Sequence, residues 1–526
     1  MKNSVYILFI IMTFSSCSTD LSDLESRLEK LETENNNHFG DKEHSDSIFP
    51  KLLSLTFEAS ANPLQLSSNI TGEIIGDSVV ECWIPNMVEN KEMSPQLSFQ
   101  GESVLIDGEP YTGGGKFDFK KPVCLSVIQK DIKKDYMVYV HSFTGLPIVM
   151  IETEERKEVT SKTEYLNASF KLIENVKTRG AGDVVSDSVQ IKGRGRSSFS
   201  EAPKKPYRLK FFKKVSLFDE PKDRSYVMIP NYFDKTMLRN WIAYYMGHLS
   251  NLDYTPSFHF VDVFFNGRYD GTYMLGDKLN ISKDRVNVGD DGFLLEVDGA
   301  VSALDGDLWF SVGPTSPFSI KDPDVIENDK DYVYIKNYIT LAYKTLFSEN
   351  FKDPNEGWRK YIDISSVVDW YLINEITKNG DALCFNTSCY MNLKRGEKLK
   401  MGPLWDFDVQ MGNNGHPAAY PVEGYTWDIM GSPWMKRFFE DEDFVKAVKE
   451  RFEYFYSKRD QIFNEINMRS EQLQRSVVEN ENRWGTLYIK TYGNYDIWGS
   501  YQNEVMQLKN WLYYRFEWLK TEYSSL

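Results

Sequence analysis

The sequence predicts a multidomain protein, with an N-terminal β-sandwich followed by a larger α+β domain that ends in helices. Three observations lead to this fold class. A chain of 526 residues is too long for one hydrophobic core. Residues 48–145 alternate short apolar and polar runs between turn residues, which is typical of strands. From about residue 435 onward, apolar and aromatic side chains recur at helical spacing.

The overall charge excludes one class of partner. The formal net charge of −16 argues against nucleic acid, because phosphate backbones are held by clustered lysines and arginines. A nucleotide site remains compatible with this charge, since a few local cations and a metal suffice there. The six histidines are scattered singly, without an H-E-x-x-H or a Cys/His cluster, so we do not expect a zinc enzyme.

The first 17 residues predict export. A basic start precedes the apolar run Val5–Phe14, which ends in Ser15, Ser16 and Cys17. This ending resembles the lipobox of bacterial lipoproteins, in which Cys17 would become the lipidated first residue; a plain signal peptide is the alternative. The run is too short to span a bilayer. We therefore expect an extracytoplasmic protein held to a bacterial membrane by its lipid alone, in the periplasm or on the cell surface.

Residues 18–47 predict a spacer. Leu21, Leu24, Leu28 and Leu31 follow a 3-4-3 spacing with charges between them, as in a short coiled-coil seam. Two heptads are marginal for an isolated coil, so this stretch is either a partly helical spacer or a weak oligomerising contact. The polar residues that follow are expected to be disordered.

Residues 48–145 predict a β-sandwich of immunoglobulin-like size, from short strands at regular spacing. No catalytic cluster stands out in it, and spacing or ligand presentation is its expected role. Cys82 and Cys124 could pair across this domain, and Cys384 with Cys389 across a later loop. The sequence does not fix this connectivity, and free buried thiols fit equally well.

A second domain begins near residue 146, and its first distinctive segment is 191–212. Gly193 and Gly195 stand there among basic residues in an otherwise acidic chain. A glycine turn lets backbone N–H groups approach a phosphate, and a cation on the next strand can neutralise it. Strand alternation places Arg208 and Lys210 on one face. One interpretation is that this cationic face covers a bound nucleotide. The other is a hairpin whose cations are solvated.

The following elements are predicted from local patterns. Asp234 is a candidate helix cap before an apolar stripe, and Asn266-Gly267 is a strong hairpin signal. Residues 292–299 indicate a buried strand that carries Glu296. Helices are expected over 330–350, over 361–379 and in the C-terminal region, where residues 476–485 form a loop between helices.

The stretch from 369 to 412 carries the most chemical content. Asp381 is followed five residues later by Asn386, and Asp406-Phe407-Asp408 comes after a short strand-like run. In phosphoryl transfer an aspartate orients the attacking hydroxyl, while an asparagine and a second aspartate hold the metal that bridges the phosphates. Protein kinases place these groups as Asp-x4-Asn and Asp-Phe-Gly, and here Asp408 replaces the glycine. Turn and capping residues could produce the same spacing.

The order of six segments resembles the spore coat protein H (CotH) kinase family. The segments are RGRSSFSEAPKKPYRLKF, PNYFDKTMLRN, VDVFFNGRYDGTYML, FLLEVDG, NGDALCFNTSCYM and PLWDFDVQMG. The resemblance covers residues 146–526 and implies an atypical kinase-like fold with a small β-rich lobe and a larger helical lobe. It also implies ATP, a divalent metal such as Mg²⁺ or Mn²⁺, and transfer to Ser or Thr hydroxyls of a protein substrate. An immunoglobulin-like module often precedes such a domain in surface lipoproteins.

The resemblance also implies roles for single residues. Asp381 would orient the substrate hydroxyl, and Asp406 with Asn386 would hold the metal, with Asp408 as a further ligand. The candidate nucleotide-binding cations are Arg196, Lys205, Arg208 and Lys210, and the residues do not separate the last three. Glu296 would pair with that cation.

A second function class is compatible with the sequence. Little ATP is available outside a bacterial cell, so the domain could be a weak or inactive kinase-like surface protein that binds glycans or proteins. The aromatic loop from Tyr420 to Trp434 could stack on sugars. A glycosidase is a third possibility, because the chain is rich in carboxylates.

Overall fold

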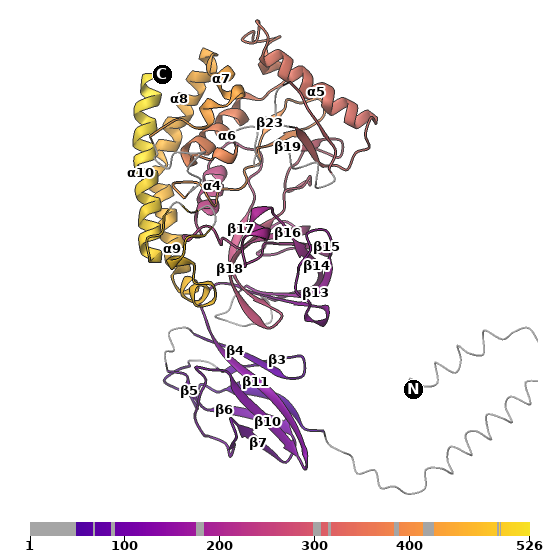
Figure 1. Ribbon diagram of the computed structural model, residues 1–526, viewed down its shortest axis with the longest axis vertical. Coiled ribbons are helices and arrows are strands. Elements are labelled where there is room, and N and C mark those ends of the chain that lie inside the picture. The colour runs from indigo at the N-terminus through magenta and orange to yellow at the C-terminus, as the bar shows by residue number, and fades with distance from the viewer. Residues whose placement is uncertain are drawn as a thin grey trace, which may run out of the picture. The chain divides into compact units, whose positions relative to one another are not determined.

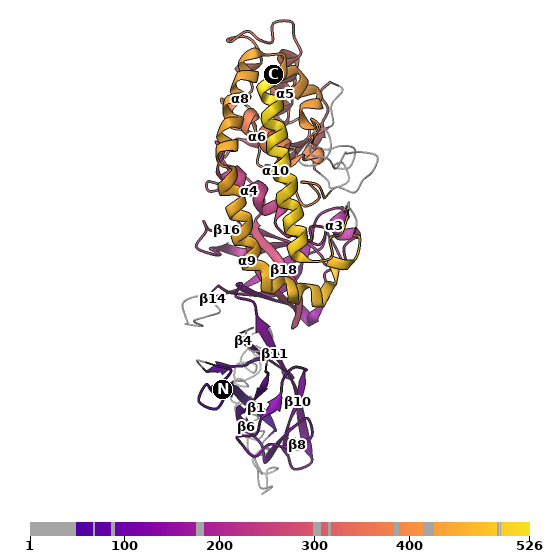
Figure 2. The same cartoon turned by 90° about the vertical axis from the view of Figure 1, so that its left-hand side faces the viewer.

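The computed structural model describes residues 49–526 with several internal gaps (Figures 1 and 2). The gaps are residues 67–68, 86–89, 175–183, 298–306, 314–316, 383–388, 414–424, 492–493 and 495. The predicted signal peptide with Cys17, the Leu21–Leu31 seam, Cys384 and Asn386 lie outside the described residues. The chain divides into two compact units, one with residues up to 63, 71–80 and 92–139, the other with 64–70, 81–91 and 140–526.

The N-terminal region is β-rich, as predicted. A three-stranded sheet has the order β2-β1-β6, a six-stranded sheet has the order β3-β4-β11-β10-β7-β8, and β5 pairs with β9. The strands are β1 (Lys51–Phe57), β2 (Ile70–Thr71), β3 (Glu73–Ile75), β4 (Val79–Pro85), β5 (Glu92–Met93), β6 (Pro95–Gln100), β7 (Ser103–Ile106), β8 (Glu109–Pro110), β9 (Phe117–Asp118), β10 (Val123–Gln129) and β11 (Ile132–Phe143). Phe57 of β1 meets Phe119 edge to face at 5.0 Å between ring centroids, in the core of this region.

Of the two alternatives for Cys82 and Cys124, the structure has the thiols, and no disulfide joins them. Cys82 lies on β4 and Cys124 on β10, and β11 runs between these two strands. Strands two places apart are separated by about 10 Å, whereas a disulfide needs Cα atoms within about 7 Å of each other. The sheet order therefore forbids the pairing.

The second unit begins with a closed seven-stranded barrel in the order β12-β13-β14-β15-β16-β18-β17. Its strands are β12 (Ile148–Thr153), β13 (Leu166–Ile173), β14 (Val184–Gly193), β15 (Tyr207–Val215), β16 (Asp223–Ile229), β17 (Phe258–Phe265) and β18 (Arg268–Asp277). Neighbouring strands are antiparallel except where β12 closes the barrel on β17, with Ile148 opposite Asp262 in a parallel pair. The sequence predicted individual strands in this region but not their closure into a barrel.

Two local predictions in the barrel are confirmed. Asn266 and Gly267 join β17 to β18 with φ of 49° and 78°, the left-handed pair that a two-residue hairpin turn needs. In β15, Leu209 and Phe211 point into the barrel core while Lys210 is exposed, so the predicted alternation holds. Phe211 meets Phe170 of β13 edge to face at 5.0 Å between centroids.

Lys204, one of the cations of segment 191–212, is a buried structural residue. Its Nζ donates to the carbonyl oxygen of Pro230 and to Oδ1 of Asn480, both at 2.8 Å, and also to the carbonyl oxygen of Thr272. The ammonium also lies over the Tyr273 ring. Burial lowers the pKa of Lys204. The lysine thus fastens the barrel to the helix that carries Asn480.

A buried carboxylate on β17 gives the barrel a testable pH dependence. Asp262 accepts hydrogen bonds from the hydroxyls of Thr144, Tyr269 and Thr272, and burial raises its pKa from 3.8 to about 6. Between these two values the unfolded chain is ionised and the folded chain is protonated, so stability falls as pH rises through this window. Above this pH window, the buried, ionised Asp262 lowers the free energy of unfolding by on the order of 3 kcal/mol.

Asp262→Asn is therefore expected to flatten the profile of melting temperature against pH between pH 4 and 6. Thermal unfolding of both proteins across this range measures the effect. Asp284→Asn, at an exposed position, serves as the control. Parallel profiles for Asp262→Asn and the wild-type protein would contradict the assignment.

A five-stranded sheet and several helices complete the second unit. The sheet has the order β20-β21-β19-β22-β23. Its strands are β19 (Phe293–Val297), β20 (Trp309–Phe310), β21 (Phe318–Asp322), β22 (Cys389–Leu393) and β23 (Lys400–Met401). The helices are α3 (Ser197–Ser200), α4 (Arg239–His248), α5 (Lys330–Leu346), α6 (Ile364–Thr377), α7 (Pro433–Phe439), α8 (Glu442–Ser457), α9 (Arg459–Trp484) and α10 (Tyr501–Ser525). The predicted buried strand over 292–299 is β19.

Helix α6 lies at the centre of this helical part. Its residues from Ser366 to Thr377 are all buried, and α10 runs beside α8 and α9 in both views (Figures 1 and 2). Asp363 caps the helix, its carboxylate accepting from the N–H of Ser366 at 2.8 Å. Lys378, with a left-handed φ of 53°, ends it. The predicted helices over 330–350 and 361–379 are therefore confirmed, with slightly shorter ends.

Two local predictions are wrong. Asp234 is not the cap residue of α4, which begins at Arg239; the Asp234 carboxylate instead accepts from the Arg239 N–H at 2.8 Å and from its guanidinium at 2.6 Å. The predicted loop over 476–485 belongs to α9, which continues to Trp484 and stops at Gly485, where φ is 60°. Within the described ranges, no helix combines the length and apolar character needed to cross a membrane.

Candidate functional site

The end of α6 positions Asp381. After Lys378 the chain forms the short 3₁₀ turn Gly380–Ala382, on which the Asp381 side chain is half-buried. Asn379 is fully buried and its Nδ2 donates to Oδ1 of Asn374 at 3.0 Å and to the carbonyl oxygen of Asp406 at 3.4 Å. The turn of Asp381 is thereby joined to the segment of Asp406. Residues 383–388 follow, so the place of Asn386 stays a prediction.

Asp406 stands in an irregular segment after β23, and the strand-like run expected before it ends at Met401. Its φ of 67° is left-handed, which is uncommon for a residue other than glycine and frequent at functional sites. Phe407 anchors the segment, because its N–H donates to Oδ1 of Asn240 at 2.8 Å and its buried ring meets Tyr244 edge to face. Asp406 is solvent-exposed and Asp408 half-buried.

Four carboxylates share one electrostatic environment here. Burial, followed by the negative charges of Asp406, Asp234 and Asp381, raises the pKa of Asp408 well above its ordinary value. Desolvation by the surrounding atoms also raises the pKa of Asp406, although its side chain is open to water, which screens the charge. A cation bound among these groups would relieve their mutual repulsion.

The donor set fits a metal shared with a substrate rather than a closed cage. In the part of the chain that the structure describes, no three Asp, Glu, His or Cys side chains converge closely enough to hold a metal by themselves. Mg²⁺ typically binds one or two carboxylates and completes its shell with water and substrate phosphates. Asp406 and Asp408 can supply that part, and Asn386 is the further ligand that the resemblance implies.

The glycine-containing turn of segment 191–212 lies next to Asp406. The positive charges of Arg194 and Arg196 lower the pKa of Asp406, opposing the effect of burial. The Arg194 guanidinium stacks over the ring of Trp405, 5.1 Å from its centroid. The chain turns tightly at Gly195, where φ is 78°, and continues into the short helix α3. The fold thus brings the predicted nucleotide turn to the predicted metal-binding residue.

The remaining candidate nucleotide-binding cations differ in their burial and in their hydrogen bonds. Lys205 Nζ donates to the carbonyl oxygen of Phe199 at 2.6 Å and so braces the turn, whereas Lys210 is exposed on β15. Arg208 is half-buried, and its Nε is buried without a hydrogen-bond partner among the described atoms. Burial, Arg208 and Lys321 lower the pKa of Lys278 to about 8, so these three cations lie near one another. Among the original three, Arg208 best suits a phosphate.

Glu296 pairs with a cation that the sequence did not single out. Its Oε2 lies 3.1 Å from Nζ of Lys321 on the neighbouring strand β21, and Oε1 accepts from the hydroxyl of Tyr390 at 2.9 Å. The expected partners were Lys205, Arg208 or Lys210. Only the register of β19 against β21, which sets Glu296 opposite Ser319, could have pointed to Lys321.

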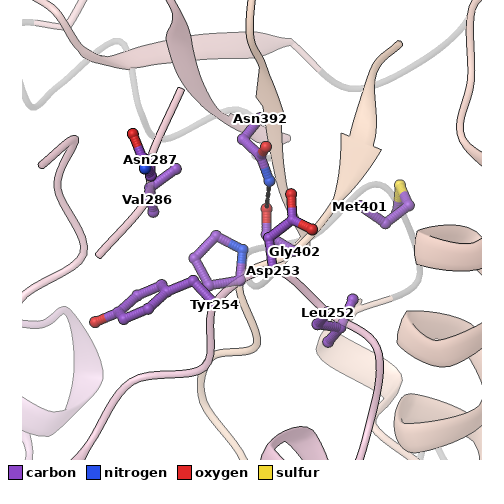
Figure 3. A pocket seen from close by; sticks show the side chains of 9 residues that line it. Leu252, Asp253, Tyr254, Val286, Asn287, Asn392, Met401 and Gly402 are labelled. Atoms are coloured by element: carbon purple, nitrogen blue, oxygen red, sulfur yellow. Dashed lines mark hydrogen bonds between the residues drawn. The ribbon is translucent and has the colours of Figure 1, made fainter. Parts of the chain in front are cut away.

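A small pocket lies beside this sheet (Figure 3). It is lined by Leu252, Asp253, Tyr254, Val286, Asn287, Asn392, Met401, Gly402 and Pro403. Asn392 donates from Nδ2 to the carbonyl oxygen of Gly402 at 3.2 Å, and Asp253 pairs with Lys400 at 2.6 Å. None of the predicted site residues lines it.

The aromatic loop that could stack on sugars is mostly packing where it is described. Trp427 meets Trp518 and Tyr523 of α10 with ring centroids 5.1 and 5.0 Å away, and Trp434 is buried. Tyr425 is exposed. Residues 414–424 lie outside the described residues.

The comparisons with known proteins give one family. A family model described as "CotH kinase protein" matches residues 189–519, more than half of the chain. No protein with a curated description matches. Among solved structures, a putative glycoside hydrolase of Bacteroides thetaiotaomicron is 14% identical, with a TM-score of 0.18. That match covers 36% of this chain and 54% of the other, about half of its length, and so loose a superposition assigns neither fold nor activity.

Proposed function

The chain belongs to the CotH kinase protein family, and from this premise we propose that it is a metal-dependent atypical protein kinase. Its proposed reaction transfers the γ-phosphate of ATP to Ser or Thr hydroxyls of a protein. The observation that carries the proposal is that hydrogen bonds from Asn379 and Gln410 join the turn of Asp381 to the Asp406–Asp408 segment, beside a glycine-containing turn whose Arg194 stacks on Trp405.

In this proposal Asp381 orients the acceptor hydroxyl and accepts its proton as the new O–P bond forms and ADP departs. Asp406, Asp408 and Asn386 would hold Mg²⁺ or Mn²⁺, which when bound neutralises charge on the phosphates. Arg194 and Arg196 flank that position. Their guanidinium groups suit phosphate oxygens because they donate in a fixed fork.

A second group of cations would neutralise the rest of the phosphate chain. Arg208, Lys278 and Lys321 come from three separate segments, and Lys321 is fixed by its ion pairs with Glu296 and Asp307. Nucleotide binding would relieve the repulsion that contributes to the lowered pKa of Lys278. In this arrangement Glu296 acts through Lys321 as a positioning residue.

We also propose that the protein works outside the cytoplasm, attached through a lipid at Cys17, and that its N-terminal β-rich region is an immunoglobulin-like sandwich. The basic, apolar and small-residue order of the first 17 residues supports the attachment, and the two sheets described above support the sandwich. A weak contact through Leu21–Leu31 would let copies associate. A catalytically weak kinase-like protein that binds a surface partner is the competing function.

Asp381→Asn is expected to lower phosphotransfer by about 10²–10⁴-fold, because general-base catalysis typically contributes this much. Transfer of labelled phosphate from ATP to the protein or a generic acceptor, with Mg²⁺ or Mn²⁺, measures the effect. Asp460→Asn is the control, since that side chain is 90% exposed on α9. Absence of label from the wild-type protein, together with absence of a metal-dependent thermal shift by nucleotide, would favour the binding-protein function.

A further inference from the structure

Gln410 makes a contact that neither the motif nor the family resemblance assigns. It lies two residues after Asp408, and only 2% of it is exposed. Its Nε2 donates to Oδ2 of Asp381 at 3.3 Å. Because an ionised carboxylate can only accept hydrogen bonds, the amide nitrogen rather than the oxygen must face Asp381.

The backbone around Gln410 is held from two sides. Its carbonyl oxygen accepts from Nε of Arg239 at 2.9 Å, and Arg239 is itself paired with Asp234 at 2.6 Å. The next residue, Met411, donates its N–H at 3.0 Å to the carbonyl oxygen of Thr377, the last residue of α6. The first residue of α4 and the end of α6 thus fix the position from which the amide reaches Asp381.

An apolar side chain in place of Gln410 would stabilise the folded protein about as well as the glutamine does. Oε1 of Gln410 is buried with no hydrogen-bond partner among the described atoms, and its bond to Asp381 is the only one that its side chain makes there. A buried polar atom without a partner destabilises the folded state. A glutamine in this environment therefore points to a role in the site rather than in packing.

We propose that Gln410 is a positioning residue, which orients the Asp381 carboxylate relative to the Asp406–Asp408 segment. This inference rests on the proposed kinase function. Asp381 stands on a single 3₁₀ turn, and its carboxylate can rotate about the terminal side-chain torsion. A donor on the metal-side segment fixes that rotation, so the base and the segment keep one geometry. Small misplacements of a reacting group are costly to rate.

Gln410→Leu, which removes the donor at similar volume, tests the proposal. We expect kcat to fall about 10- to 100-fold, while the KM for ATP and the metal-dependent thermal shift by nucleotide stay within about twofold of wild type. The melting temperature should be unchanged or higher.

Gln461→Leu is the matched control, because this exposed glutamine of α9 donates to the hydroxyl of Tyr245 at 2.8 Å, away from the site. A kcat of Gln410→Leu within twofold of wild type would overturn the proposal. So would an equal loss of kcat and of the nucleotide-dependent thermal shift, since that pattern indicates a damaged site rather than a misoriented base.

A second measurement separates this inference from the proposed function. Melting temperatures of Gln410→Leu, Asp381→Asn and the double variant form a cycle that needs no activity. Additive changes would overturn the contact between Gln410 and Asp381, whether or not the protein transfers phosphate. If the changes in melting temperature are non-additive and the wild-type protein transfers no phosphate, the contact between Gln410 and Asp381 is retained and the kinase function is rejected.

Discussion

Asp406→Asn is expected to lower kcat/KM for phosphotransfer by about 10³-fold or more. Losing a metal-binding carboxylate removes several kcal/mol of charge stabilisation, and each 1.36 kcal/mol corresponds to about tenfold in rate. The fold should survive, because asparagine tolerates the left-handed backbone at this position better than any other uncharged residue except glycine. Initial rates over a range of Mg²⁺ and Mn²⁺ concentrations, with a melting curve for each protein, measure the effect.

Two features of that experiment make it decisive for the role of Asp406. A weakened metal site should need more metal for half-maximal rate, whereas a change in the acceptor site should not. Asp460→Asn on α9 is the control for a lost surface charge. Wild-type turnover with an unchanged metal requirement in Asp406→Asn would rule out this residue as a metal ligand.

Arg515→Met is expected to destabilise the protein by about 3–5 kcal/mol, the usual effect of removing one partner from a buried ion pair. Arg515 and Glu375 are both fully buried, and the guanidinium lies 2.7 Å from Oε1 of the glutamate. It also donates to the carbonyl oxygens of Glu375 and Thr426. The variant would leave a buried carboxylate without its cation. Urea unfolding followed by circular dichroism measures the loss.

The matched control is Lys520→Met, at an exposed position on the same helix α10. The double variant Arg515→Met/Glu375→Met is expected to recover part of the stability, since it leaves no unpaired buried charge. If Arg515→Met unfolded at the same urea concentration as the control, the pair would contribute nothing and the assignment would be wrong.

Predictions from local pattern succeeded where the structure is set by neighbouring residues. The Asn266-Gly267 turn, the alternation of β15 and the two helices α5 and α6 all follow from residues within one turn or one strand of each other. The apolar period decides which face is buried, and the turn residues decide the backbone angles. These effects need no knowledge of distant contacts.

Predictions failed or stopped short where the outcome depends on which strands become neighbours. Cys82 and Cys124 are kept apart by β11, and Glu296 finds Lys321 through the pairing of β19 with β21. Neither relation is visible in the spacing of residues along the chain. The loop predicted over 476–485 failed for a related reason, because the polar Asn480 looks like a loop residue in sequence but is buried in α9, where it accepts from Lys204 of a distant segment.

The same distinction between local sequence pattern and distant contacts applies to the residues of the candidate site. Asp381, Asp406 and Asp408 stand in recognisable motifs, and the structure brings them into one electrostatic environment. Lys278 and Gln410 were not singled out, and Arg194 was noted only as one of the basic residues of segment 191–212, because their importance comes from contacts between segments far apart in sequence. Residues of this kind cannot be identified from one sequence segment at a time.

The parallel closure of the barrel sets an order on folding. β12 pairs with β17, which follows it by on the order of a hundred residues, so joining the two requires closing a very long loop at an entropic cost of about 4 kcal/mol. The antiparallel hairpin β17–β18 and the pair β12–β13 close much shorter loops and can form earlier. During synthesis β12 emerges first and keeps an unpaired edge until β17 has followed. Refolding should therefore be slow at the closing seam, and the seam is where partly folded chains are exposed to aggregation.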